Sequence, residues 1–378
     1  MKKILFITHD DMTGGSAKSL IAQIEYFVVN ELIEPIVITW KENSLTEYLR
    51  RKGIRCYAVK YDFTSVWTRN RLFHFIKRPY YRLFYNSLAY RVLKKRIDFS
   101  EISLILSNSS VIDFGAYLHR KLQIPHVWYL REFGDLDFNI LSYVNNLPQY
   151  IENNSDGIIA VSNAVARHWS NRGIKKDIEV IYDGVIERVR LPKEYEKKEV
   201  VKICMCGRLS PAKGQYLAIK ALSFLPQRVL DRTHIDFFGN GESEKDLQNF
   251  AKKLNLESYI SFKGFSCNLD EELDNYDIGL TLSKAEAFGR TTIEYMNHAL
   301  FVIGTNTGGT PELLQDGKCG ALVDSNDPEQ VAKVIIEYFE NFNDFCEKAT
   351  LGQTYANEKF AVDNCAKKTF CFYKSIWK

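Results

Sequence analysis

Short runs of β-branched and other apolar residues recur along the chain, each bounded by polar or glycine-containing turns and followed by a segment with helical periodicity. Unbroken runs of this kind are typical of strands buried on both faces of a parallel sheet. They predict strands at 4–8, 35–39, 102–106, 126–130, 157–161 and 179–181, and again at 200–204, 234–238, 260–262, 278–282, 301–304 and 320–323. Because strands that alternate with helices form doubly wound parallel sheets, the two series predict two Rossmann-like α/β domains.

A charged, proline-containing stretch at residues 190–199 has no apolar periodicity and separates the two series. We expect it to join a first domain, residues 1–189, to a second domain, residues 190–360. At 378 residues the chain is also longer than one hydrophobic core usually supports. Open α/β sheets bind ligands at the carboxyl ends of their strands, so two facing sheets would place a site in the cleft between them.

Composition narrows the class of protein. A hydrophobic fraction of 46% with 26% charged residues is that of a folded globular chain. The net charge of +3 is too small for bulk attraction to nucleic acid. The eight cysteines contain no C-x-x-C and no zinc-type Cys/His spacing, so we expect them to be reduced and to bind no metal. The apolar run after Lys2 and Lys3 stops too soon for a signal peptide, and no run approaches the ~20 apolar residues of a membrane span, which predicts a cytoplasmic protein.

The strongest chemical signal is the segment Ser283-Lys-Ala-Glu-Ala-Phe-Gly-Arg-Thr-Thr-Ile-Glu294, which follows the predicted strand 278–282. Gly289 and the threonines after it predict a helix start, whose free amides suit a phosphate group. Glu286 would precede this helix and Glu294 would lie in its second turn, so that each carboxylate could accept hydrogen bonds from hydroxyl groups. A surface role for two such glutamates is the alternative.

The E-x(7)-E spacing with Phe-Gly inside resembles the donor-site signature of retaining glycosyltransferases of family 4. Cys206-Gly-Arg-Leu-Ser-Pro-Ala-Lys-Gly214 resembles that family's diphosphate loop, and Asp183-Gly-Val185 resembles the Asn-Gly-Val that ends its N-terminal domain. Gly308-Gly-Thr-Pro-Glu312 and Asp316-Gly-Lys-Cys-Gly320 resemble the segments after the signature. The matches span essentially the whole chain.

The resemblance implies the GT-B fold and a set of site residues. Arg208 and Lys213 would hold the departing diphosphate, Glu286 would contact the sugar and Glu294 the ribose. The other residues of the signature expected at the donor are Phe288, Gly289, Arg290 and Thr291. Without a metal, the charge that develops on the diphosphate needs fixed cations and backbone amides, which two basic side chains and a helix start can supply.

Gly14 and Gly15 follow the first predicted strand and precede a helical pattern. Paired glycines allow a ligand close to the backbone, and by resemblance this is the loop beside the donor phosphates and the acceptor. His9, at the end of the same strand, is a candidate for the acceptor side. Gly239-Asn-Gly241 lacks the third glycine of a dinucleotide fingerprint and predicts only a turn near the nucleotide.

Arg131 is a departure from the family pattern, because the resembled enzymes usually carry there a histidine that contacts the transferred sugar. Either Arg131 replaces it as a cationic donor, which we favour, or the protein is inactive. His126, on the preceding strand, is expected to be a packed histidine. Asp135-Leu-Asp137 has the D-x-D spacing of metal-dependent glycosyltransferases, but it does not follow its strand directly, so we expect no metal there.

From residue 67 to residue 96 the chain has no acidic residue and interleaves basic with aromatic side chains. We expect two helical pieces, broken at Pro79, that bind an anionic membrane surface. Nucleic-acid binding and a solvated basic face with aromatics packed inward are the alternatives. We expect this acceptor and membrane surface to include Trp67, Lys77, Arg78, Lys94 and Lys95.

These features predict a retaining, metal-independent hexosyltransferase with no cofactor besides its co-substrate, a nucleoside-diphosphate sugar. In the resembled family the leaving phosphate oxygen is thought to deprotonate the acceptor, and a C-terminal helix, here about 361–378, packs back on the N-terminal domain. We expect a saccharide acceptor, carried on a lipid, from bacterial surface-polysaccharide synthesis, and a peripheral location at the inner face of the plasma membrane. A catalytically silent accessory subunit and a sugar-nucleotide epimerase are the other readings.

Overall fold

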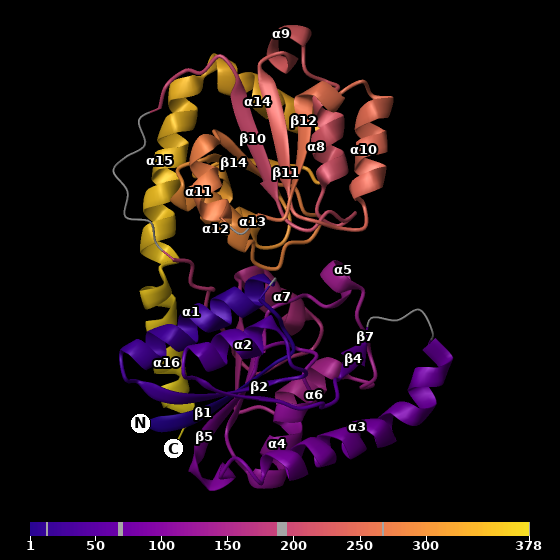
Figure 1. The fold of residues 1–378 in the computed structure, drawn as a ribbon, viewed down its shortest axis with the longest axis vertical. Helices are drawn as coiled ribbons and strands as arrows, with labels where there is room; N and C mark the ends of the chain where they lie inside the picture. Colours follow the sequence, from indigo (N-terminus) through magenta and orange to yellow (C-terminus); the bar gives the residue numbers. More distant parts are fainter. Residues whose placement is uncertain (13, 67–70, 187–194, 267, 378) are drawn as a thin grey trace. The chain divides into compact units, whose positions relative to one another are not determined.

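The computed structural model describes residues 1–12, 14–66, 71–186, 195–266 and 268–377; of residue 66 and residues 71–81 it describes the backbone alone. The chain divides into two compact units (Figure 1). Unit 1 contains Met1–Gly184 and Val362–Lys378, and unit 2 contains Val185–Ala361. The sequence boundary expected at residues 189 and 190 lies outside the described residues.

Unit 1 is built on a seven-stranded parallel sheet with the strand order β3-β2-β1-β5-β6-β8-β9. β1 pairs with β2 on one side and with β5 on the other. The strand order therefore reverses between β3 and β5, which makes β1 and β5 the switch point of the sheet. A short antiparallel pair, β4 and β7, lies outside this sheet. The strands are β1 (Lys2–Thr8), β2 (Ile33–Thr39), β3 (Arg55–Ala58), β4 (Ser65–Val66), β5 (Ile102–Ser107), β6 (His126–Leu130), β7 (Leu141–Ser142), β8 (Gly157–Ala160) and β9 (Ile178–Val180).

The helices of unit 1 follow the strands in the alternating order of a doubly wound fold. The last of them comes from the far end of the sequence and packs beside the first (Figure 1). They are α1 (Gly15–Val29), α2 (Ser44–Arg51), α3 (Arg71–Leu93), η1 (Phe99–Glu101), α4 (Phe114–Leu122), α5 (Asp135–Phe138), α6 (Leu147–Asn153), α7 (Asn163–Asn171) and α16 (Val362–Ile376).

Unit 2 repeats the plan with a six-stranded parallel sheet, ordered β12-β11-β10-β13-β14-β15, whose switch point lies between β10 and β13. The strands are β10 (Val201–Cys206), β11 (Thr233–Phe238), β12 (Ile260–Gly264), β13 (Ile278–Thr281), β14 (Phe301–Thr305) and β15 (Ala321–Val323). The helices are α8 (Gln215–Leu222), α9 (Gln227–Leu230), α10 (Glu244–Lys253), η2 (Glu257–Tyr259), α11 (Leu269–Glu272), η3 (Leu273–Asn275), α12 (Arg290–Asn297), α13 (Thr310–Leu313), η4 (Gln315–Gly317), α14 (Pro328–Glu340) and α15 (Phe342–Lys359).

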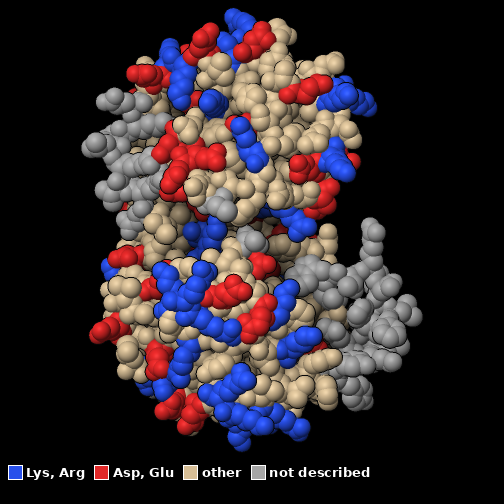
Figure 2. Space-filling model, viewed as in Figure 1, with Lys and Arg blue, Asp and Glu red and all other residues tan. Residues whose placement is uncertain are grey.

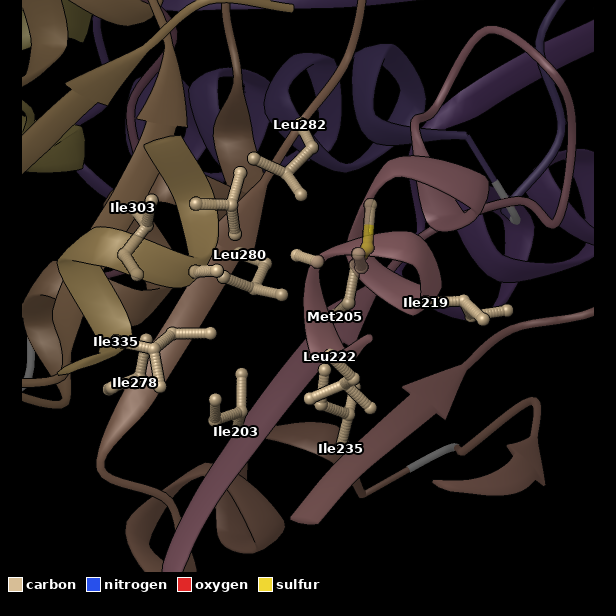
Figure 3. Close-up of a cluster of buried hydrophobic side chains, with 14 of the residues drawn as sticks. Ile203, Met205, Ile219, Leu222, Ile235, Ile278, Leu280, Leu282, Ile303 and Ile335 are labelled. Carbon is tan, nitrogen blue, oxygen red and sulfur yellow. The ribbon is translucent and has the colours of Figure 1, made fainter. Parts of the chain in front are cut away.

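The core of unit 2 lies between its sheet and the helices that cover it. Figure 3 shows Ile203 and Met205 of β10 among side chains from β13, β14 and α8. Ile203, Ile278 and Ile303 have no solvent exposure. Burial of each such side chain stabilises the folded unit by about 1.5–3 kcal/mol. The resulting rigid sheet fixes the loops at its carboxyl edge.

The predicted fold class is confirmed, since all twelve predicted strands are present within one or two residues at most ends. The break expected at Pro79 is wrong, because α3 continues through that residue. A proline removes one backbone donor and disfavours the turn before it, but hydrogen bonds on either side can keep the helix continuous. Among the described residues, no helix has both the length and the apolar character of a membrane span.

Candidate functional site

The candidate donor residues of unit 2 gather on loops at the carboxyl ends of β10 and β13. β10 ends at Cys206 and is followed by Arg208 and Lys213, while β13 ends at Thr281 and is followed by Glu286. These two strands are neighbours at the switch point, where the connections on either side diverge and leave room for a ligand. The fold therefore brings together two motifs that are about eighty residues apart in sequence.

Lys213 and Glu286 form the closest pair among these residues. The Lys213 Nζ donates to Glu286 Oε2 at 2.8 Å, and the Ser283 hydroxyl donates to the same oxygen at 2.7 Å. Burial alone would raise the pKa of Glu286, but the charge and hydrogen bond of Lys213, with Ser283, outweigh it and lower this pKa. Glu286 is therefore ionised at neutral pH and can accept hydrogen bonds from sugar hydroxyls.

Gly214 explains how the two loops come so close. Its φ is +85°, and a Cβ there would lie 2.0 Å from the carbonyl oxygen of Leu282, so no other residue fits without movement of the backbone. The amide of Lys284 also donates to the carbonyl of Ala212 at 3.0 Å. Both contacts lock the 207–214 loop against the 282–289 loop, which holds Lys213 beside Glu286.

The helix start predicted after Gly289 is present. Gly289 is the N-cap of α12 with φ +98°, and Arg290 and Thr291 open the helix. Glu294 lies in the second turn and accepts from Arg290 Nε at 3.1 Å. The 308–309 loop supports this segment, because the Gly309 amide donates to the carbonyl of Glu286 at 2.7 Å.

The backbone around Glu286 also depends on Gly308, where a Cβ would lie 2.2 Å from the Glu286 carbonyl oxygen. Phe288 is 5% exposed, and its ring packs edge to face on Phe360. Its contribution to a ligand would therefore come mainly from the backbone. Together these contacts fix the loop that precedes α12.

Arg208 is more exposed than the other candidates. Its side chain is 72% exposed, and its Nε donates to Glu242 at 3.0 Å. A Cβ on Gly239 would lie 2.1 Å from the Gly207 carbonyl oxygen, and one on Gly241 would lie 2.0 Å from the Leu209 carbonyl oxygen. The two glycines that the sequence marked only as a turn thus allow the 239–242 loop to pack directly against the Arg208 backbone.

In unit 1, Gly14 is the N-cap of α1 and Gly15 its first residue. A Cβ on Gly14 would meet only ordinary contacts, the nearest being the Ser16 hydroxyl at 3.7 Å, so the described packing does not require glycine there. His9 follows β1, and its ring packs edge to face on Phe63 at 5.8 Å. Among the described residues Gly14 thus has room for a side chain, and the close approach of a ligand there stays a prediction.

Arg131 follows β6 and is held by three residues. Its Nη1 donates to both oxygens of Asp183 at 2.5 and 2.6 Å, and its Nε donates to Asn108 Oδ1 at 2.7 Å. Its guanidinium lies 4.1 Å from the centre of the Tyr129 ring. Burial alone would lower the pKa of Arg131, but Asp183 and Tyr129 outweigh it and raise this pKa. Sequence reasoning missed Asp183, although both residues depart from the family pattern and their charges are opposite.

The other polar candidates near β6 have structural partners. His126 is fully buried between the Ser107 hydroxyl at 2.9 Å and the Asn154 carbonyl at 2.6 Å, which confirms the packed histidine. Asp137 accepts from the amides of Phe133 and Gly134 at the start of α5. Asp135, by contrast, contacts His168 and Arg172. The two carboxylates of the D-x-D motif therefore bond to different partners.

The described part of the basic aromatic segment has one buried and one exposed face. Asn86, Ala89 and Leu93 of α3 are buried. In Figure 2 Lys and Arg side chains gather at the lower edge of unit 1, where α3 ends in Figure 1. Trp67 lies outside the described residues, as do the side chains of Lys77 and Arg78. The exposed side chains are Leu83, Phe84, Tyr85, Leu88 and Val92, with Arg91, Lys94, Lys95 and Arg96.

Two family profiles match the chain in succession. Residues 43–187 match Glycosyltransferase Family 4, and residues 188–350 match Glycosyl transferases group 1. An uncharacterized glycosyltransferase of Methanocaldococcus jannaschii is 28% identical over 343 residues, which cover 86% of this chain and 92% of that protein.

Solved structures share the fold over its full length. Anabaena HepE in complex with UDP and glucose has a TM-score of 0.81 at 20% identity, covering 100% of both chains. The lipopolysaccharide outer core galactosyltransferase WaaB has a TM-score of 0.72 at 16% identity, covering 99% of this chain and 100% of that one. The two profiles together match residues 43–350, and the solved structures share the fold of the chain. The chain therefore belongs to glycosyltransferase family 4 and is a retaining GT-B enzyme that uses a nucleotide sugar.

Proposed function

We propose that this enzyme transfers a hexose from a UDP-sugar to a lipid-linked saccharide during synthesis of a bacterial surface polysaccharide. The observation that carries the proposal is the Lys213–Glu286 pair at 2.8 Å, locked before the start of α12 by Gly214. HepE, whose structure contains UDP and glucose, supports UDP as the first nucleotide to test.

In this proposal Lys213 and Arg208 stabilise the negative charge that develops on the leaving diphosphate. Lys213 acts as a point charge, and Arg208 exchanges its exposed bond with Glu242 for two bonds to phosphate oxygens. The amides of Arg290 and Thr291 at the start of α12 face the same anion. Glu286 accepts from the sugar hydroxyls, and Glu294 accepts from the ribose.

In unit 1, Gly14 and Gly15 border the donor phosphates, His9 contacts the acceptor and Arg131 donates to the transferred sugar. Asp10 accepts from the Thr8 hydroxyl at 2.7 Å and from Asn108 at 3.2 Å, so the residues after β1, β5 and β6 share one hydrogen-bonded network. This network supports a common role for the loops at the carboxyl edge of the sheet.

The test of the donor site is nucleotide release from a panel of UDP, GDP and ADP sugars. Lys213→Ala and Glu286→Gln should each lower kcat about 10²–10³-fold, the usual effect of removing one preorganised group from a site of developing charge. Lys284→Ala is the matched control, since Lys284 is an exposed lysine of the same loop. Wild-type turnover in both test variants would refute the assignment, and absence of release by the wild type from every donor would favour a silent accessory subunit.

We further propose that the exposed face of α3 holds the enzyme on anionic lipid at the inner face of the plasma membrane. Phe84 is 62% and Leu83 55% exposed, which is unusual for large apolar side chains of one helix. The exposed basic residues Arg91, Lys94 and Lys95 follow them in the sequence. Apolar side chains at headgroup level with adjacent cations are typical of peripheral membrane helices, in which each cation near the surface contributes about 1 kcal/mol.

Flotation with phosphatidylglycerol vesicles tests this surface. Phe84→Ser and the pair Lys94→Glu with Lys95→Glu should each reduce the bound fraction, and the charge variant should remove its salt dependence. Val29→Ser is the control, because Val29 is an exposed apolar residue of α1. Equal flotation of wild type and variants, or binding to neutral vesicles alone, would contradict the proposal.

A further inference from the structure

The carboxyl edge of the unit 1 sheet contains a buried ion pair for which the family pattern gives no role. Arg131 is 5% exposed and Asp183 9% exposed at the side chain. Asp183 follows β9, two strands away from β6 in the sheet, and its oxygen also lies 3.4 Å from the hydroxyl of Tyr129. Two elements of the sheet therefore converge on one guanidinium.

The pair lies at the end of the sheet where ligands of this fold bind, and not in the middle of the core. Buried ion pairs contribute little net stability compared with apolar residues of similar volume, so core packing alone does not explain this one. Asp183 offsets the charge of Arg131, so that the cation can remain out of water before an anionic ligand arrives. This favours a functional reason for the pair.

The hydrogen bonds that Arg131 makes with described residues involve only part of its guanidinium. Nη1 bonds to Asp183 and Nε to Asn108, and the Tyr129 ring covers one face. Within the described ranges, none of the hydrogen bonds made by Arg131 uses Nη2. Because the guanidinium is planar and held on three sides, the two N–H donors of Nη2 have fixed directions.

We infer that Asp183 is a positioning residue that fixes Arg131 so that Nη2 donates to an oxygen of the sugar nucleotide. Asn108 completes the arrangement and ties it to Asp10 after β1. In this enzyme Arg131 stands where the family pattern has a His, and Asp183 stands where it has a neutral Asn. The inference rests on the proposed function, because it assigns these residues to the same transfer.

The first test compares Asp183→Asn with Asp113→Asn. Asp113 is also a buried acid of unit 1 with a cationic neighbour, since Arg82 Nε lies 3.4 Å from it. We expect both variants to lower Tm, and only Asp183→Asn to lower kcat, by about tenfold to a hundredfold, because a shift of about 1 Å in a reacting group has effects of this size. Wild-type kcat per folded molecule in Asp183→Asn would overturn the inference.

The second test uses pH, which a purely structural role would not affect. In Arg131→His, the facing Asp183 should raise the imidazole pKa above its usual value of about 6.5, so that turnover falls as pH rises through that raised pKa. In the double variant Arg131→His, Asp183→Asn the fall should occur at lower pH, by about one unit. The titratable groups that face position 131 are Asp183, Asp10, Tyr129 and Tyr373.

Identical pH profiles of the single and double variants would also overturn the inference. Both tests use the full chain and the UDP-sugar that the wild type hydrolyses or transfers. If the wild type released no nucleotide from any sugar nucleotide, the proposed function would fail and this inference with it. An active wild type with an unaffected Asp183→Asn variant would refute the inference alone.

Discussion

Gly214→Ala should silence the enzyme through geometry, without removal of any functional group. The new Cβ would lie 2.0 Å from the Leu282 carbonyl oxygen, whereas ordinary contact begins at 3.4 Å, so the two loops must separate by about 1.4 Å. The left-handed backbone at φ +85° adds about 1–2 kcal/mol for alanine. A displacement of this size at Lys213 should lower kcat about 10²-fold, which corresponds to about 2.7 kcal/mol of transition-state stabilisation.

The assay is nucleotide release at saturating donor, together with thermal unfolding. Gly317→Ala is the matched control in the same unit, because Gly317 has φ +93° and a Cβ there would meet no heavy atom of the described residues within 4 Å. Both variants bear the backbone cost, but only Gly214→Ala bears the clash. Equal kcat values for the two variants would refute the reasoning that Gly214 sets the position of Lys213.

Three further variants test other parts of the structure. Burial lowers the pKa of His126 to about 3, so the folded protein does not bind the proton that the unfolded chain binds near pH 6.5. The free energy of unfolding of the wild type, measured in urea, should therefore fall below pH 6.5 relative to that of His126→Gln, by at most about 1.4 kcal/mol per pH unit. Burial raises the pKa of Asp137 to about 6, so its ionisation opposes folding as pH rises through 6; Asp137→Asn should raise Tm more at pH 8 than at pH 5, and the reverse order would contradict the shift. Gly14→Ala should leave Tm unchanged and weaken donor turnover, and a large loss of Tm would instead make Gly14 structural.

The sequence predicted the strands of the two sheets well because parallel strands are unbroken apolar runs. β3 was missed, since its sequence Arg-Cys-Tyr-Ala alternates and begins with an exposed arginine. β4 and β7 were missed because two-residue strands have no periodicity to detect. The sequence also did not reveal that α3 is continuous, because a proline inside a helical pattern usually ends or kinks the helix.

The structure brings several of the predicted candidate residues together, but the sequence did not reveal which of them are paired. Strand order decides which loops are neighbours, and the sequence does not reveal that β10 lies beside β13. The contact between Lys213 and Glu286 therefore emerged only from the fold. The sequence contained one signal for the pairing of Arg131 with Asp183. Compared with the family pattern, Asp183 replaces a neutral Asn and Arg131 replaces a His, so the two positions carry opposite charges. The sequence does not show that the two residues are close in space, and only the structure reveals the pair.

The origin of α16 has a consequence for how the protein folds as it is made. Gln23 of α1 donates to Thr369 at 2.9 Å, and Tyr373 of α16 has no solvent exposure in unit 1. A Cβ on Gly157 of β8 would collide with Ile376 and Phe372, so α16 lies directly on that strand. Residues 362–378 are synthesised after all of unit 2, so most of unit 1 is made first but cannot bind α16 until unit 2 has also been made. During translation its apolar surface around α1 and β8 remains open to chaperones and to aggregation, while the later half can already be complete.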